Sequence, residues 1–186
     1  PLRTYQFADG LYVVWAAPEL ADLLGARIDT IDGRSVSDIH TATRRYAGGT
    51  DAHRQRMLTA MLESPALLQA AGLANARDAL TIRGVLLGGA PFERRIAAEE
   101  RDRSAWVSSS QRLLFPVWEG APMRSLINRG DDLPAYLRHS SNLFSLESLP
   151  ERGLYVGLAH NDDADESPIA TFLDSALARV RSEPPP

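Results

Sequence analysis

The sequence contains no cysteine and no lysine, and all 20 of its Lys/Arg-class residues are arginine. The lack of cysteine excludes a disulfide framework, a thiol nucleophile, an iron–sulfur cluster and a cysteine-ligated zinc ion. The lack of lysine excludes a Schiff base, a phosphate-loop lysine and a Ser–Lys catalytic pair. Since a chain without cysteine suits oxidising and reducing compartments equally, its location stays open.

Long hydrophobic runs and an excess of positive charge are also missing. The longest apolar run, Leu11–Ala17, is far shorter than the roughly 20 residues that cross a bilayer as a helix. The formal net charge of −4 argues against general nucleic-acid binding, which needs a basic face. No charged-then-apolar leader opens the chain, and Pro1 stands in place of methionine, so we expect a piece of a longer protein.

What is present is an ordinary globular composition over 186 residues, which is enough for about one domain or one domain and part of another. In the first part of the chain, Asp9-Gly10 predicts a turn, and the aromatic and β-branched segment Leu11–Trp15 after it predicts a strand. Pro18 is expected to open a short helix. The segment 26–31 then predicts a strand that ends in a tight turn at Asp32-Gly33.

Helical signals dominate the next part of the chain. Ser37 as N-cap and an i, i+3, i+4, i+7 apolar pattern predict a helix to about Tyr46. A second helix is expected over about 52–63, and Ser64-Pro65 predicts the start of a third. Two strands are expected after these helices, over Ala79–Leu87 and Pro91–Ala97.

The pattern fades after residue 99, and we expect 100–150 to be a connector. The apolar run Gly153–Ala159 predicts a buried strand, and Ser167-Pro168 predicts the start of another helix. A strand followed by a helix is half of a βαβ unit, whose parallel partner strand is missing from the chain.

Residue clusters that would carry chemistry fail their spacing tests. The acidic loop Asn161–Glu166 lacks the glycine and the glutamate that an EF-hand needs at its sixth and twelfth positions, so we interpret it as a solvated loop. No histidine pair has metal-ligand spacing, and no G-x-S-x-G segment presents a serine nucleophile. The sequence therefore predicts no metal, no cofactor and no catalytic site. The arginine pairs Arg44/Arg45 and Arg94/Arg95 are interpreted as solvated surface residues. The three tryptophans, Trp15, Trp106 and Trp118, are interpreted as packing residues.

The order of elements resembles a PDZ-like module of the bacterial form. In such a module a strand (here with Leu11-Tyr12-Val13) is followed by a short helix, a Gly-led strand with an Ile-Asp-Gly turn (Ile31-Asp32-Gly33) and a longer helix, here 37–46. The strands over 79–87 and 91–97 would close the module. The helical stretch 52–73 would be an insertion, which such modules do not usually carry.

The downstream part is similar to the region just before the catalytic core of tail-specific (C-terminal-processing, S41-type) serine peptidases. The similar segments are Leu133–Leu137, Leu149-Pro150 and Leu154–Val156, followed by an acidic loop and a helix. In those proteins the catalytic Ser and Lys come later, and no position of this chain matches them. The resemblance implies an α+β fold: a PDZ-like partly open β-barrel or sheet over 1–99 with a helical insertion at about 50–75, a connector over 100–150 and the first strand–helix unit of an α/β peptidase core over 151–186.

The resemblance also implies a function and its residues. We expect a non-catalytic recognition or regulatory segment of a bacterial peptidase involved in proteolysis, in the periplasm or another extracytoplasmic space, which binds an extended peptide or a protein C-terminus by strand addition. The alternative is a scaffold or lid that packs on its own peptidase domain, in which case the isolated chain should self-associate as a homodimer. The residues that would carry peptide binding are Gly10, Leu11, Tyr12, Val13 and Val14 on the strand and Ile39, His40 and Thr43 on the helix.

Overall fold

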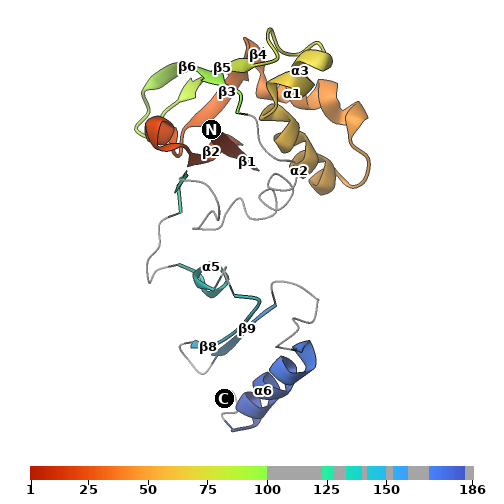
Figure 1. Cartoon of the computed structure of the whole chain (residues 1–186), viewed down its shortest axis with the longest axis vertical. Coiled ribbons are helices and arrows are strands. Elements are labelled where there is room, and N and C mark those ends of the chain that lie inside the picture. The colour runs from red at the N-terminus through yellow and green to blue at the C-terminus, as the bar shows by residue number, and fades with distance from the viewer. Residues whose placement is uncertain (100–122, 128–132, 140–141, 150–152, 159–167, 183–186) are drawn as a thin grey trace. The chain divides into compact units, whose positions relative to one another are not determined.

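The computed structural model describes residues 1–99, 123–127, 133–139, 142–149, 153–158 and 168–182. The chain forms two compact units, Pro1–Ile127 and Asn128–Pro186 (Figure 1). Both units combine helices with antiparallel strands, so the expected α+β class is confirmed at this level.

The first unit is built on a curved antiparallel sheet that starts with a hairpin. Strands β1 (Leu2–Phe7) and β2 (Gly10–Ala16) pair along their lengths and are joined by a two-residue turn at Ala8-Asp9. The expected strand over Leu11–Trp15 is therefore confirmed as part of β2. β1, in contrast, was not among the predicted elements. After β2, the short 3₁₀ helix η1 (Pro18–Leu23) occupies the place of the expected short helix.

Strand β3 (Arg27–Ile31) turns sharply into β4 (Arg34–Ser35) at the expected Asp32-Gly33 turn. Both turn residues have positive φ, 47° and 79°, as a tight hairpin turn requires. The Asp32 carboxylate accepts backbone N–H groups of Thr81 and Asn75, each at 2.7 Å. This side chain therefore ties the turn to strands and loops almost fifty residues further along the chain.

Three helices follow, and each begins at a side-chain cap. Helix α1 (Val36–Thr43) is capped by Ser35, whose Oγ accepts the Asp38 amide at 3.0 Å, so the expected cap at Ser37 is two residues too late. α1 continues into the 3₁₀ helix η2 (Arg44–Tyr46). The two helices expected over about 52–63 and after Ser64 are confirmed as α2 (Asp51–Leu62) and α3 (Pro65–Ala70), capped by Thr50 and Ser64.

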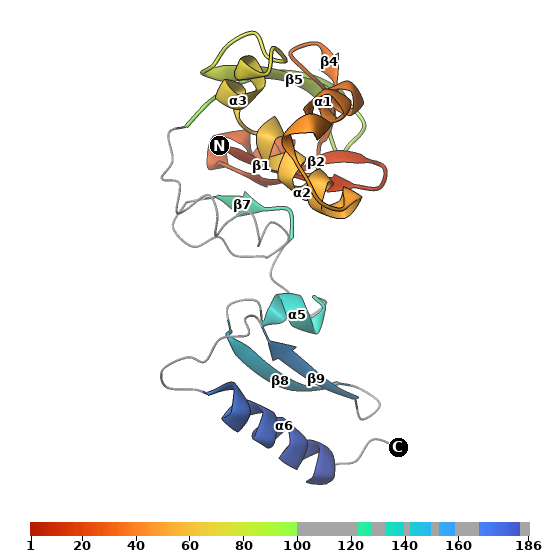
Figure 2. The same cartoon turned by 90° about the vertical axis from the view of Figure 1, so that its right-hand side faces the viewer.

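The sheet is completed by β5 (Ala79–Val85) and β6 (Pro91–Ala97), which pair along all seven residues. The strand order is β1-β2-β3-β5-β6, and the two-residue strand β7 (Arg124–Ser125) pairs with β2. β1 and β6 are therefore the end strands of this path. The three helices lie together on one side of the sheet (Figures 1 and 2), and the core between them is apolar, with Leu11, Ile28, Ile31, Ile39, Leu62, Leu68, Leu80 and Ile82 buried.

The described residues of the second unit form a two-stranded sheet and two helices, α5 (Ala135–Arg138) and α6 (Ile169–Ser182). Strand β8 (Phe144–Leu149), which lies in the expected connector, pairs antiparallel with β9 (Gly153–Leu158). The strand expected over Gly153–Ala159 was predicted to be buried, but Val156 and Leu158 are 41% and 42% exposed. Phe172 of α6 stacks on Phe144 of β8, with ring centroids 4.9 Å apart.

None of the helices in the described part of the chain is both long and apolar enough to cross a membrane.

Gly84 offers a direct test of the β3–β5 pairing. A Cβ added at Gly84 would lie 1.9 Å from the carbonyl oxygen of Arg27, whereas a Cβ at Gly88 would meet nothing within 4 Å. We expect Gly84→Ala to destabilise the first unit by about 2–3 kcal/mol, because the strands must separate to make room. Gly88→Ala, the matched control, should change stability by less than about 0.5 kcal/mol. Urea unfolding would measure both, and equal midpoints for the two variants would contradict the observed register.

Candidate functional site

The strand that was expected to receive a peptide has neighbours on both sides. β2 pairs with β1 along one edge and with β3 and β7 along the other. Between those two partners, Val13 exchanges backbone hydrogen bonds with Gly25 and Ala26, and the Leu126 amide donates to Val14. Strand addition needs unpaired backbone groups, so within the described structure β2 has no edge to offer. The candidate edge therefore moves from β2 to β1.

Seven of the eight predicted site residues separate into two groups, and Tyr12 belongs to neither. Those of the first group are buried in the core and cannot contact a ligand without unfolding: Val13, Val14, Ile39 and Thr43 are at most 1% exposed. Thr43 is satisfied within its own helix, because its hydroxyl donates to the Ile39 carbonyl at 2.7 Å. Tyr12 lies at the surface, where its hydroxyl donates to Asp9 at 2.9 Å.

The second group, Gly10, Leu11 and His40, lines one groove, although Leu11 is itself only 1% exposed. We call this cavity of ≈ 650 Å³ the α1 groove; it is bounded by the β1–β2 hairpin, β3, the first turns of α1, and α2. Its remaining charged and polar lining includes Gln6, Asp9, Arg27, Asp29, Arg44, Asp51 and Arg54. The structure thus brings together three of the eight predicted residues, and it adds a polar wall that the sequence did not indicate.

His40 connects the groove to the edge strand. Its Nε2 lies 3.3 Å from Oε1 of Gln6 on β1, so α1 and β1 are joined across the groove by side chains. Burial lowers the pKa of His40 below its ordinary value of 6.5, because the surrounding protein disfavours the charged imidazolium. The groove therefore favours a neutral imidazole, which carries one hydrogen-bond donor and one acceptor.

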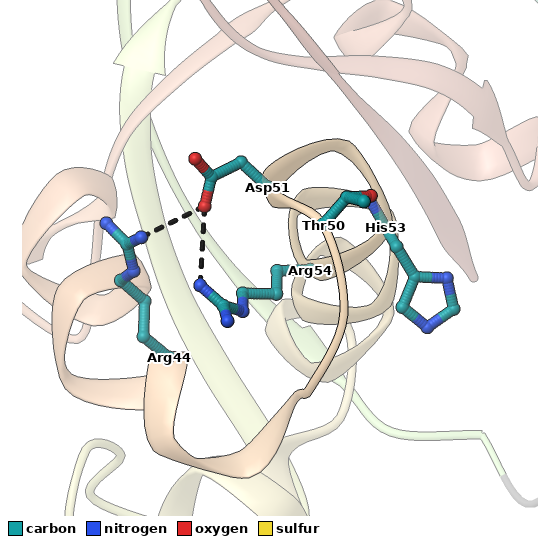
Figure 3. Close-up of polar contacts among 5 residues, drawn as sticks. All are labelled: Arg44, Thr50, Asp51, His53 and Arg54. Atoms are coloured by element: carbon teal, nitrogen blue, oxygen red, sulfur yellow. Dashed lines mark hydrogen bonds and ion pairs between the residues drawn. The ribbon is translucent and has the colours of Figure 1, made fainter.

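The far wall of the groove is held by one carboxylate between two guanidinium groups. Asp51, the first residue of α2, accepts from Arg44 at 3.0 Å and from Arg54 at 3.4 Å (Figure 3). Arg44 follows α1, so this cluster links the start of α2 to the end of α1. Because all three side chains are at least one-third exposed, the link contributes little to stability.

The outer edge of β1 carries a contact that sequence reasoning missed. The backbone amide of Thr4 donates to Oε1 of Glu63 at 2.6 Å, and the Thr4 hydroxyl donates to the same oxygen at 3.0 Å. The Nε of Arg3 lies 2.7 Å from Oε2 of Glu63. One carboxylate from the end of α2 thus accepts hydrogen bonds from an amide and a hydroxyl and forms an ion pair with a guanidinium. Alternation along an antiparallel strand places the amide of Gln6 on the same outer edge as that of Thr4.

Glu63 is in an unusual place for a carboxylate. It is the C-cap of α2, where the helix dipole disfavours negative charge, and its side chain is only 11% exposed. Burial raises the pKa of Glu63 above its ordinary value of 4.5, while Arg3 and the Thr4 donors act in the opposite direction. Local structure does not favour a glutamate here, so its tertiary contacts with β1 are what hold the charge.

An apolar cavity lies beside this carboxylate contact. We call it the β1–β6 cavity; its volume is ≈ 460 Å³, and both end strands of the sheet line it together with the α2–α3 junction. Leu2, Leu62, Leu67, Leu80 and Ile96 contribute apolar side chains to its wall, next to Arg3, Thr4 and Glu63. A carboxylate-binding group beside an apolar cavity is a combination that can hold the end of a peptide chain.

The candidate chemistry elsewhere in the chain is limited. In the second unit, Glu147 contacts both His139, at 2.5 Å, and Arg138; these contacts, His139 first, lower the pKa of Glu147. Among the described residues, no group of three or more His, Asp or Glu side chains is arranged to hold a metal ion. The acidic loop Asn161–Glu166, and Trp106 and Trp118, lie outside the described residues.

Searches against protein-family models, curated proteins and solved structures each found no match to the chain.

The lowered pKa of His40 predicts a pH-dependent contribution to stability. Because the unfolded chain takes up a proton on this residue more readily than the folded one, the stabilisation is present above about pH 6.5 and is lost as the pH falls towards the lowered pKa. We expect the difference in unfolding free energy between the wild type and His40→Gln to shrink between about pH 7.5 and 5.5. His53→Gln, on the exposed side of α2, is the control. A difference that is constant with pH for His40 would show that its imidazole is not desolvated.

Proposed function

We propose that the first unit is a PDZ-like, non-catalytic peptide-recognition segment of an S41-like serine peptidase. The observation that carries the proposal is an edge strand, β1, that borders a polar groove on the side of α1 and an apolar cavity on the side of β6. The order of elements, with the Ile31-Asp32-Gly33 turn between the sheet and α1, supports the same proposal.

The mechanism is strand addition at β1. An extended peptide would accept from the outer amides of β1, those of Thr4 and Gln6, and would extend the sheet by one strand. Its alternate side chains would face the helices, where His40 and Gln6 can select polar groups and the β1–β6 cavity can take an apolar one. The role of the first unit is recognition: no nucleophile, metal site or cofactor is needed for it.

Proline at position 6 tests strand addition without disturbing the β1–β2 hairpin. The Gln6 amide points away from β2, so Gln6→Pro removes one outer donor while the pairing with β2 remains. We expect this variant to bind fluorescein-labelled peptides with free C-termini at least about fivefold more weakly than Gln6→Ala, which loses the same side chain but keeps the amide. Fluorescence anisotropy on the full chain would measure both affinities. Equal affinities for the proline and alanine variants would exclude β1 as the receiving edge.

A second candidate function, packing on its own peptidase core, is favoured by the second unit. Val156 and Leu158 of β9 and a stripe of α6 are between 39% and 51% exposed, the stripe being Leu173, Leu177 and Val180. These α6 positions follow the i, i+4, i+7 spacing of one helix face. A two-stranded sheet is marginally stable by itself, so the proposal assigns this apolar surface to contact with further protein.

The second candidate predicts self-association of the isolated chain. With its apolar surface uncovered, the chain should form dimers or larger species whose proportion rises with concentration. Leu173→Gln together with Leu177→Gln should shift the distribution towards the monomer, whereas Ala178→Gln, also on α6 but outside the stripe, should not. Multi-angle light scattering at several concentrations would measure this. A wild-type chain that is monomeric throughout would remove the support for this role.

A further inference from the structure

The contact between Glu63 and β1 has the chemistry of a bound ligand. A strand-adding peptide that ends at this point would present a terminal carboxylate to the donors that now surround Glu63: the Thr4 amide, the Thr4 hydroxyl and the Arg3 guanidinium. Arg3 and Thr4 are each only 4% exposed, so these groups are desolvated; Thr4 donates to one oxygen of the carboxylate, and Arg3 forms an ion pair with the other. Charge-assisted bonds of this kind are the strong ones in proteins.

We infer that Arg3 and Thr4 form a carboxylate-binding site and that Glu63, supplied by the helical insertion, is its internal ligand. This inference rests on the proposed function and adds its regulation: a peptide with a free C-terminus competes with Glu63 for the same donors. Glu63 therefore keeps the first unit closed to ligands that lack a terminal carboxylate.

The way in which the helical insertion is attached to the rest of the first unit is consistent with Glu63 being a displaceable internal ligand. α2 and α3 each carry their own N-cap, Thr50 and Ser64, so the link between them at Glu63-Ser64 is a junction between two separately capped helices. The start of α2 is held to α1 through the exposed Asp51 cluster, which is weak. Among the α2 side chains described, Thr59 and Leu62 are buried while Met57 is 42% exposed. Release of Glu63 thus requires opening one junction rather than unfolding the sheet.

The cavity next to Glu63 gives the displacing peptide its second anchor. The β1–β6 cavity of ≈ 460 Å³ is continuous with the carboxylate contact, since Arg3, Thr4 and Glu63 are part of its lining. A peptide whose last residue is apolar would place its carboxylate on Arg3 and Thr4 and its side chain in this cavity. Glu63 makes the carboxylate contact but not the cavity contact. A peptide that makes both contacts therefore has an advantage over Glu63.

The test compares Glu63→Gln with a matched control, Glu19→Gln, on the full chain. Glu19 is an exposed residue of η1, so its variant has the same change in net charge. Each variant and the wild type are titrated by fluorescence anisotropy with one labelled peptide that ends in leucine, as the free acid and as the C-terminal amide. Removing a competitor that occupies the site about 90% of the time should raise the apparent affinity about tenfold. We expect this gain for the acid on Glu63→Gln alone, with no gain for the amide.

Other outcomes separate the two proposals. If the wild type prefers the acid over the amide but Glu63→Gln binds no tighter, Glu63 is not a competitor, and the inference fails while the proposed function stands. An equal gain for acid and amide would likewise overturn the inference, since the effect would then be general loosening. If no variant binds either peptide, the proposed function fails and the inference fails with it. Should Glu63→Gln not fold, Glu63→Asp, whose shorter side chain reaches the donors less well, must show a smaller acid-specific gain for the inference to hold.

Discussion

The hydrogen bonds that Glu63 accepts from Thr4 occupy one position on the outer edge of β1, the first strand of the sheet in the first unit. β1 is the first strand of the sheet path, and an unpaired end strand invites pairing with other chains. Here one of its outer amides is satisfied by a carboxylate from the end of α2 rather than by a strand. Arg3 and Thr4 offset part of the cost of burying this carboxylate at a helix C-terminus. The end of α2 therefore has a physical role at the sheet edge, because one of its side chains satisfies the outer amide of Thr4.

Most elements of the first unit were predictable because their signals are local. The turn at Asp32-Gly33, the cap at Ser64 and the alternation over Ala79–Leu87 each depend on residues within a few positions. The cap of α1 was misplaced because Ser35 and Ser37 are both good caps, and the β3–β4 turn fixes which one is used. β8 was missed because Ser145, Glu147 and Ser148 interrupt its apolar pattern, and its stability comes from pairing with β9.

The candidate site was harder to predict, because an edge is a property of the whole sheet. The segment Gly10–Val14 has the strongest strand signal near the N-terminus, yet that same apolar character is what places it between two other strands. The receiving edge that we propose lies on Leu2–Phe7, whose Arg, Thr and Gln weaken the strand signal but would suit a half-buried strand that faces a ligand. Glu63 lies 59 residues from Thr4 in the sequence, and no periodicity or motif connects two residues so far apart.

The two candidate functions belong to different units and do not compete for one surface. In the first unit, the Thr4 amide at the sheet edge is satisfied internally by Glu63, so binding at that position requires exchange of one acceptor for another. In the second unit, apolar side chains of β9 and α6 are exposed, and the packing role proposed for this unit would cover them with further protein. The two proposed contacts should respond differently to added salt. Charge-assisted contacts, such as those at the edge of β1, weaken with salt. Apolar contacts, such as those on β9 and α6, are strengthened by excluded salts such as sulfate. One chain can therefore combine a reversible recognition site at the edge of β1 with a permanent contact surface on β9 and α6.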